Sequence, residues 1–165
     1  MFKTRAYTSA DWPVVDRIFR EGLETGLATF ETEPKKQSDF EGKCVPDSAL
    51  VAVSEDDSVV GWAVLWPVSD RCVYGGVAEV SIYIGAEARG KGLGKILLTA
   101  LIERSEELGM WSLQAGTFED NHGSQAIHKA CGFRLVGIRE RIGKLHGVWR
   151  NNMIWERRSE VVGID

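Results

Sequence analysis

The chain has 165 residues, 44% of them hydrophobic and 27% charged, which is the composition of a single ordinary soluble globular domain. A formal net charge of −4 argues against a surface that coats nucleic acid, so no nucleic-acid partner is expected. No stretch approaches the roughly 18 apolar residues that span a bilayer, and no signal peptide is recognisable. We therefore expect a cytoplasmic protein without a membrane partner. The three cysteines form no C-x-x-C pair, and His122 and His146 lack partners at metal-ligand spacing, so neither a disulfide framework nor a metal site is expected.

The first third of the chain is predicted to contain one strand and two helices. A strand over residues 3–7 precedes a helix that Ser9 or Asp11 can cap, with Pro13 in its opening turn. The apolar stripe of this helix stops near residues 22–26. An irregular segment follows, and the capping-box pattern Ser38-Asp-Phe-Glu41 then predicts a second, shorter helix.

The middle of the chain is organised around residues 77–98. Apolar runs at 49–53 and 59–66, separated by the turn 55–58, predict a hairpin. Residues 77–84 are rich in β-branched side chains and predict a further strand, whereas apolar residues from position 92 onward recur at helical spacing. The remaining elements are a strand at 112–118, a helix at 123–130 with Gly132 as its cap, and strands at 133–142 and 148–157.

The turn between the strand 77–84 and the helix after it reads Arg89-Gly-Lys-Gly-Leu-Gly94. Glycines let backbone N–H groups approach a ligand closely, and here the amides point out from the positive end of a helix dipole. The turn therefore predicts a site for a polyanion such as a pyrophosphate. A nucleotide-triphosphatase loop would need Ser or Thr where Gly92 stands, and the dinucleotide fingerprint would need glycine at Lys95.

This turn matches the R/Q-x-x-G-x-G/A pattern of the GCN5-related N-acetyltransferases, and the order β-α-α-β-β-β-α-β-α-β-β resembles their fold over nearly the whole chain. The resemblance implies a single N-acetyltransferase domain over residues 1–165, of mixed α/β class. Its mostly antiparallel central sheet would be flanked by helices and splayed between the fourth and fifth strands. Acetyl-CoA would be the cosubstrate. Its pyrophosphate would lie on Arg89, Gly90, Lys91, Gly92, Leu93, Gly94 and Lys95.

The same resemblance assigns the rest of the acetyl-CoA site. The pantetheine arm would pair with the backbone of Ile82, Tyr83 and Ile84, and Asn121 would bond the arm near the thioester.

Two side chains are candidates for catalysis. Glu79 lies in an apolar run, where a carboxylate is costly unless it is paired or used, and it could take the proton of the attacking amine. A partly exposed glutamate at the start of a strand is the alternative. His128 lies in an N-x-x-S-x-x-x-[YH]-x-x-x-G-F signature, where many members have a tyrosine that protonates the leaving thiolate. His128 could do the same, assist the base, or only form a hydrogen bond with the substrate or backbone.

Within the family, the chain looks most like the phosphinothricin and methionine sulfone N-acetyltransferases. The resemblance rests on Thr29-Phe30-Glu31, on Tyr74, on His128 and on the element Gly143-Lys144-x-x-Gly147-x-Trp149. It implies a homodimer that acetylates the α-amine of a small amino-acid analogue. The substrate-binding residues would be Phe30, Glu31, Arg71, Cys72, Val73 and Tyr74.

The chain departs from the subfamily pattern at Gly75, Val77 and Asn151. The anionic end of the substrate must therefore be bound by other residues, for which Arg71 and Lys144 are the candidates. Alternatives that the sequence leaves open are an aminoglycoside or a protein N-terminus as the acceptor. A non-catalytic acyl-CoA sensor is disfavoured because it would need neither Glu79 nor His128.

Overall fold

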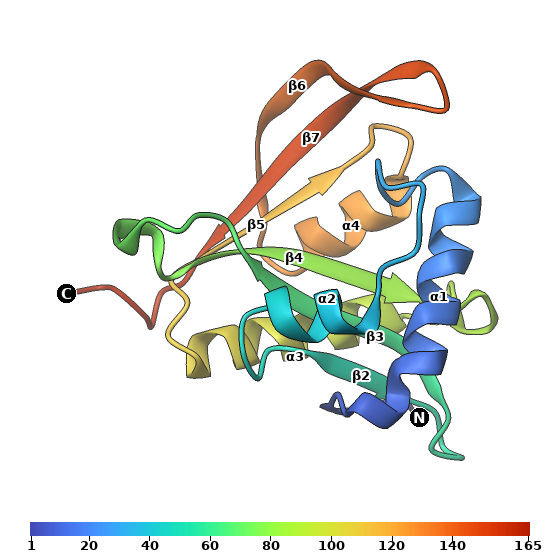
Figure 1. The fold of residues 1–165 in the computed structure, drawn as a ribbon. Helices are drawn as coiled ribbons and strands as arrows, with labels where there is room; N and C mark the ends of the chain where they lie inside the picture. Colours follow the sequence, from blue (N-terminus) through green and yellow to red (C-terminus); the bar gives the residue numbers. More distant parts are fainter.

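The computed structural model describes residues 1–165 and places seven strands in one sheet of order β1-β2-β3-β4-β5-β7-β6 (Figure 1). The strands are β1 (Lys3–Ala6), β2 (Leu50–Val53), β3 (Val59–Pro67), β4 (Val77–Ile84), β5 (Ser112–Thr117), β6 (Arg134–Leu145) and β7 (Val148–Arg158). The helices are α1 (Trp12–Thr25), α2 (Gln37–Lys43), α3 (Leu93–Glu107) and α4 (His122–Ala130). The predicted order of elements is confirmed. None of the helices has the length and hydrophobicity that crossing a bilayer requires.

Helices cover both faces of the first half of the sheet, which explains why β2 and β3 are apolar without interruption. Side chains alternate between the two faces of a strand. Val51 and Trp62 accordingly pack under α1 and α2, whereas Ala52 and Ala63 pack under α3. Figure 1 shows α1 and α2 in front of the sheet and α3 behind it. The two apolar clusters fix the first four strands as a rigid platform.

The sheet divides between β4 and β5, its one parallel pair. These strands are paired only from Val77 to Glu79, opposite Ser112 to Gln114. Beyond that point β4 remains paired with β3 as far as Ile84, and β5 remains paired with β7 as far as Thr117. Each strand therefore keeps its outer neighbour while the two halves of the sheet diverge. The predicted splay between the fourth and fifth strands is confirmed.

One local prediction in the first third of the chain is wrong. The helix α2 begins at Gln37 after an extended Lys36, so Ser38 lies inside the first turn and caps nothing. The capping box belongs instead to Thr8, whose N–H donates to the Asp11 carboxylate at 2.8 Å. A hydrogen bond from Arg5 lowers the pKa of Asp11 to about 2. The predicted end of the first helix near residues 22–26 is confirmed, because α1 ends at Thr25 and Gly26 caps it with a φ of 65°. Gly22 lies within the helix, where a Cβ would lie 2.7 Å from the Tyr83 ring.

We predict that Gly76→Ala destabilises the protein by about 1–3 kcal/mol, the usual cost of overpacking. A Cβ at Gly76 would lie 2.0 Å from the Trp111 ring. The backbone cannot easily move away, because the Gly76 carbonyl accepts hydrogen bonds from the N–H groups of Trp111 and Ser112 just before the paired part of β4 and β5. Gly42→Ala is the matched control, because its Cβ would have no atom within 4 Å and alanine favours the helix. Urea unfolding measures both. Equal stability of the two variants would contradict the prediction.

Candidate active site

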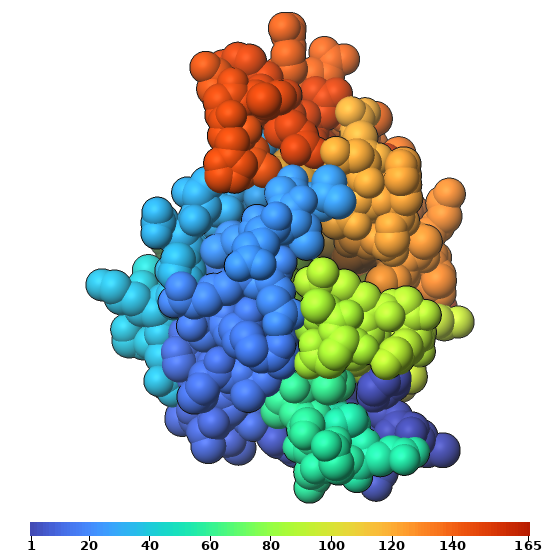
Figure 2. Space-filling view, turned by 90° about the vertical axis from the view of Figure 1, so that its right-hand side faces the viewer, coloured from blue at the N-terminus to red at the C-terminus, as the bar shows by residue number.

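A cleft of about 1110 Å³ opens where β4 and β5 diverge. Its walls come from β4, β5, the first turn of α3, α4, the strands β6 and β7, the end of α1 and the start of the segment between α1 and α2. We call this segment (Gly26–Lys36) the strap. Figure 2 views this side of the molecule: the strap in light blue, the loop around residues 85–92 in yellow-green and α4 in orange meet around a hollow. The cleft is therefore bounded by segments that lie far apart in the sequence.

The glycine-rich loop between β4 and α3 closes one end of the cleft. Gly90 and Gly92 have positive φ angles of 73° and 78°, and a Cβ at either would meet no atom within 4 Å. Backbone conformation, not lack of space, therefore requires glycine there. The amides of residues 89–92 have no hydrogen-bond partner within the chain. They lie directly before the 15-residue helix α3, so the loop can receive an anion.

Of the residues predicted to hold the pyrophosphate, Lys91 is exposed and lies off the cleft wall, while the other six line it. Ile82, Tyr83 and Ile84 also line the cleft, on the stretch of β4 that β5 no longer pairs.

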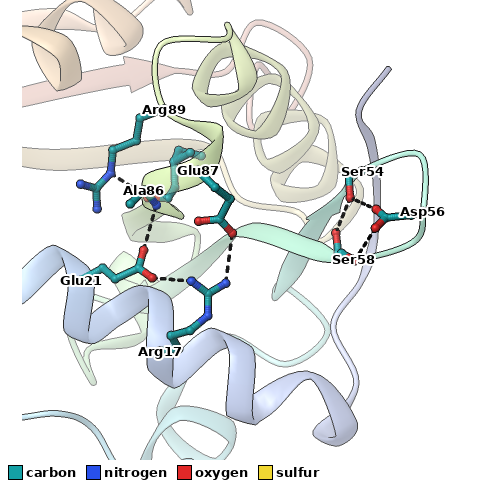
Figure 3. Close-up of polar contacts among 9 residues, drawn as sticks. Arg17, Glu21, Ser54, Asp56, Ser58, Ala86, Glu87 and Arg89 are labelled. Carbon is teal, nitrogen blue, oxygen red and sulfur yellow. Dashed lines mark hydrogen bonds and ion pairs between the residues drawn. The ribbon is translucent and has the colours of Figure 1, made fainter.

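Side chains of α1 hold the same loop from the opposite side (Figure 3). Glu21 accepts the Ala86 N–H at 2.8 Å and also pairs with Arg17. Arg17 reaches Glu87 at 3.1 Å, and this hydrogen bond raises the pKa of Arg17. Arg89 donates through Nε to the Ile84 carbonyl at 3.1 Å, which leaves the rest of its guanidinium free. Arg17 thus neutralises two carboxylates beside the loop, and the basic side chains of the loop remain available for an anion.

Glu79 is the last β4 residue that pairs with β5, and its side chain is exposed on the cleft wall. Ala78 and Val80 on either side of it are buried. The alternation of the strand turns Glu79 away from the core, so its carboxylate stays exposed, as the alternative interpretation of the sequence allowed, and burial imposes no cost on it. The carboxylate has no hydrogen bond or ion pair within the chain, so it is available to a ligand in the cleft.

His128 lies on α4 and is only 3% exposed. Its Nδ1 is 2.7 Å from the Ser124 carbonyl oxygen, which can only accept, so Nδ1 carries the proton. The other ring nitrogen, Nε2, is then a bare acceptor that is buried without a partner. Burial lowers the pKa of His128. The neutral ring can accept a hydrogen bond or a proton at Nε2, whereas the role of acid would need the imidazolium that burial disfavours.

Asn121 has two structural bonds at the mouth of the cleft. Its Oδ1 accepts the Ser124 N–H at 3.2 Å and caps α4, and its Nδ2 donates to the Leu27 carbonyl of the strap at 3.1 Å. The second N–H of the amide remains free for a ligand. Asn121 therefore joins α4 to the strap as well as lining the cleft.

The strap brings one of the predicted substrate residues into the cleft. Phe30 lines it, packs edge-on against Phe118 at a centroid distance of 4.7 Å and lies against Gly143. Glu31 is not part of the lining and instead holds Lys35 at 2.6 Å.

The other four predicted substrate residues, Arg71 to Tyr74, form an exposed turn outside the cleft lining, with the Arg71 guanidinium 5.6 Å from the Tyr74 ring centroid. The single chain does not bring this turn to the cleft.

The structure adds residues that the sequence did not indicate, chiefly Gln114, Asn152, Arg139 and Ile142. Glu79 is the one acidic lining residue, whereas four are basic: Arg89 and Lys95 at the glycine-rich loop, and Arg139 and Lys144 on β6. The cleft therefore combines one carboxylate with two separate pairs of cations.

The acetyltransferase (GNAT) family model matches residues 12–133, which is most of the chain and includes the glycine-rich loop. The chain belongs to this family. It is thus an N-acetyltransferase. It is 30% identical over 159 residues to the phosphinothricin N-acetyltransferase of Alcaligenes faecalis, covering 93% of this chain and 80% of that protein. It is 29% identical over 145 residues to the L-methionine sulfoximine/L-methionine sulfone acetyltransferase of Pseudomonas paraeruginosa, covering 85% and 84%.

Among solved structures, a phosphinothricin acetyltransferase from Sinorhizobium meliloti in complex with acetyl-CoA superposes with a TM-score of 0.84 at 30% identity. The match covers 99% of this chain and 96% of that one. The resemblance noted in the sequence is confirmed at the level of family, fold and named relatives.

We predict that the folded protein loses stability as the pH falls below about 6.5 and that His128→Gln reduces this loss. Burial lowers the pKa of His128 in the folded state, so the unfolded chain binds the extra proton first, and stability rises with pH through this window. Urea unfolding at several values between about pH 5 and pH 7.5 measures the slope. A slope unchanged in His128→Gln would contradict the prediction.

Proposed function

We propose that this chain transfers the acetyl group of acetyl-CoA to the primary amine of a small amino-acid-like substrate of the phosphinothricin or methionine sulfone type. Transfer would occur by direct attack of the amine on the thioester. The proposal is supported by the names of its relatives and by the charges that line the cleft. The second support is independent of any comparison.

The residues present fit acetyl-CoA. The unpartnered amides of residues 89–92, with Arg89 and Lys95, suit a pyrophosphate at the start of α3. The edge of β4 from Val80 to Ile84 offers backbone groups that no strand pairs on the β5 side. The amide groups of the pantetheine arm of acetyl-CoA can form hydrogen bonds with this edge, as an added strand would.

Glu79 would act as the general base. An amine with a pKa above neutrality must lose a proton before it attacks, and the exposed, unpaired Glu79 carboxylate can take it directly or through one water. The new N–C bond forms as the C–S bond breaks, and the proton balance is completed when the thiolate is protonated. The Nε2 lone pair of His128 suits an assisting proton acceptor more than a proton donor.

The single observation that carries the substrate class is the distribution of charge. Glu79 attracts an amine, while Arg139 and Lys144 attract an anionic group on the same molecule. A compound with both groups, such as an amino acid, satisfies this arrangement. An aminoglycoside carries several positive charges and no anion, so these two cations would repel it.

We further propose that the protein is a homodimer. β6 and β7 expose several large apolar side chains, with Trp149 55% exposed. An apolar surface of this kind on a terminal hairpin suits a second copy of the chain. A second copy could also bring residues of the exposed turn Arg71–Tyr74 towards a cleft.

The test of the function is thiol release from acetyl-CoA with a panel of amines: phosphinothricin, methionine sulfone, methionine sulfoximine, an aminoglycoside and an N-terminal peptide. We expect turnover with the first three. We expect Glu79→Gln to lower kcat by roughly ten- to ten-thousandfold, the range for loss of a general base, while acetyl-CoA still binds. Turnover confined to the aminoglycoside or the peptide would overturn the substrate class. Unchanged turnover of Glu79→Gln across pH would overturn the role of Glu79.

We predict that Gly92→Ala raises KM for acetyl-CoA by roughly tenfold or more, the scale of one lost charge-assisted hydrogen bond. A side chain disfavours the φ of +78°, so relief of the strain would turn the free amides away from the phosphates. Gly109→Ala is the matched control, because φ there is +79° and the position is equally open, at the far end of α3. Equal KM values in the two variants would contradict the placement of the pyrophosphate.

A further inference from the structure

The strand β6 contains an irregularity where it borders the cleft. Arg139 lies opposite Asn152 and Gly143 lies opposite Arg150, so three residues of β6, 140–142, stand against the single residue Asn151 of β7. Arg141 within this bulge has a positive φ of 45°. Bulges redirect the side chains of a strand and are frequent beside active sites.

The side chain of Asn151 holds the bulge in place. Its Oδ1 accepts the Arg141 N–H at 2.8 Å, and its Nδ2 donates to the Glu119 carboxylate at 3.0 Å. Glu119 belongs to the loop between β5 and α4, so the Asn151 amide fastens the bulge to that loop. The pairing requires a group that accepts on one side and donates on the other, which a carboxylate cannot do.

The part of β6 that contains the bulge forms a wall of the cleft. Four residues of this part of β6 line the cavity: Arg139 before the bulge, Ile142 within it, and Gly143 and Lys144 after it. Gly143 lies under Phe30 of the strap, and the Lys144 ammonium lies 4.9 Å from the Trp149 ring centroid. The nearby Arg150 is occupied elsewhere, because it pairs with Asp120 at 2.6 Å and lies over the Phe118 ring. Arg139 and Lys144 are therefore the cations of this wall that face the cleft.

We propose that Asn151 is a positioning residue that sets acceptor specificity. By fixing the bulge it holds Arg139 and Lys144 where they bind the anionic group of an amino acid whose amine lies at Glu79. This inference rests on the proposed function and adds the subsite that would bind the carboxylate or phosphinate group of the acceptor substrate. It assigns no role to Asn151 in the binding of acetyl-CoA.

The test compares methionine sulfone with its carboxamide, which lacks the anionic group, in the wild type and in Asn151→Asp. The substitution keeps the size and the acceptor for Arg141, but it removes the N–H donor and places a second carboxylate beside Glu119. We expect the wild type to prefer the free acid. In Asn151→Asp, KM for methionine sulfone should rise and the preference in kcat/KM should fall by roughly ten- to a hundredfold. KM for acetyl-CoA should stay near its original value.

A double variant that exchanges the amide and the carboxylate between positions 151 and 119 distinguishes a positioning role of Asn151 from a general loss of structure. In the double variant Asn151→Asp/Glu119→Gln, the new amide at position 119 can donate to the new carboxylate at position 151, so the preference for the free acid should return. Glu119→Gln alone is the control. An unchanged preference in Asn151→Asp, or a loss that the double variant fails to rescue, would overturn the proposal.

Two further outcomes are distinguishable. If the wild type acetylates both compounds equally, the anionic subsite is wrong while the proposed acetyl transfer stands. If the wild type acetylates neither compound nor any other amine of the panel, both proposals fail. Should Asn151→Asp not fold, the exposed Arg139→Gln serves instead, and an unchanged preference in that variant would overturn the subsite.

Discussion

The structure depends on the early end of the pairing between β4 and β5. Three residue pairs hold the strands together, and then each strand follows its outer neighbour. An unpaired strand edge inside a sheet is unfavourable unless something bonds its backbone groups. Here the edge forms the wall of a cleft. Glu79 stands at the point of divergence, and the glycine-rich loop stands where β4 ends. The interruption of the sheet thus places a carboxylate at one end of the exposed edge and, at the other, the glycine-rich loop that we propose binds the pyrophosphate.

Hydrogen bonds between distant parts of the chain hold the cleft open in a defined shape. Glu21 fastens the glycine-rich loop to α1, Asn121 fastens the strap to α4, and Asn151 fastens the bulge of β6 to the loop after β5. Each bond joins a segment without regular structure to a helix or strand that is packed in the sheet. The glycine-rich loop and the β6 wall of the cleft are therefore held by separate hydrogen bonds.

Elements with strong periodicity could be predicted from the sequence. β4 was predicted over residues 77–84 because β-branched residues fill it, and α3 because its leucines recur on one face. Features that depend on tertiary contacts were not predictable. The contact with the Tyr83 ring that leaves no room for a Cβ at Gly22 is invisible in the sequence. Glu79 proved exposed, because the cleft beside it exists only once the sheet divides. Arg139 and Ile142 gave no signal in the sequence. Their places in the cleft depend on a bulge in β6, which is held by a hydrogen bond from Arg141 to Asn151 on the neighbouring strand.

The measurement that tests the account most directly is hydrogen–deuterium exchange with and without acetyl-CoA. If the gap between β4 and β5 receives the pantetheine arm, amides that face it between Val80 and Ile84 should exchange readily in the free protein. They should become protected on binding, together with the amides of residues 89–94. The fully paired β2 should not change. Binding that protects neither segment would contradict the claim that the divergence of β4 and β5 creates the cofactor site.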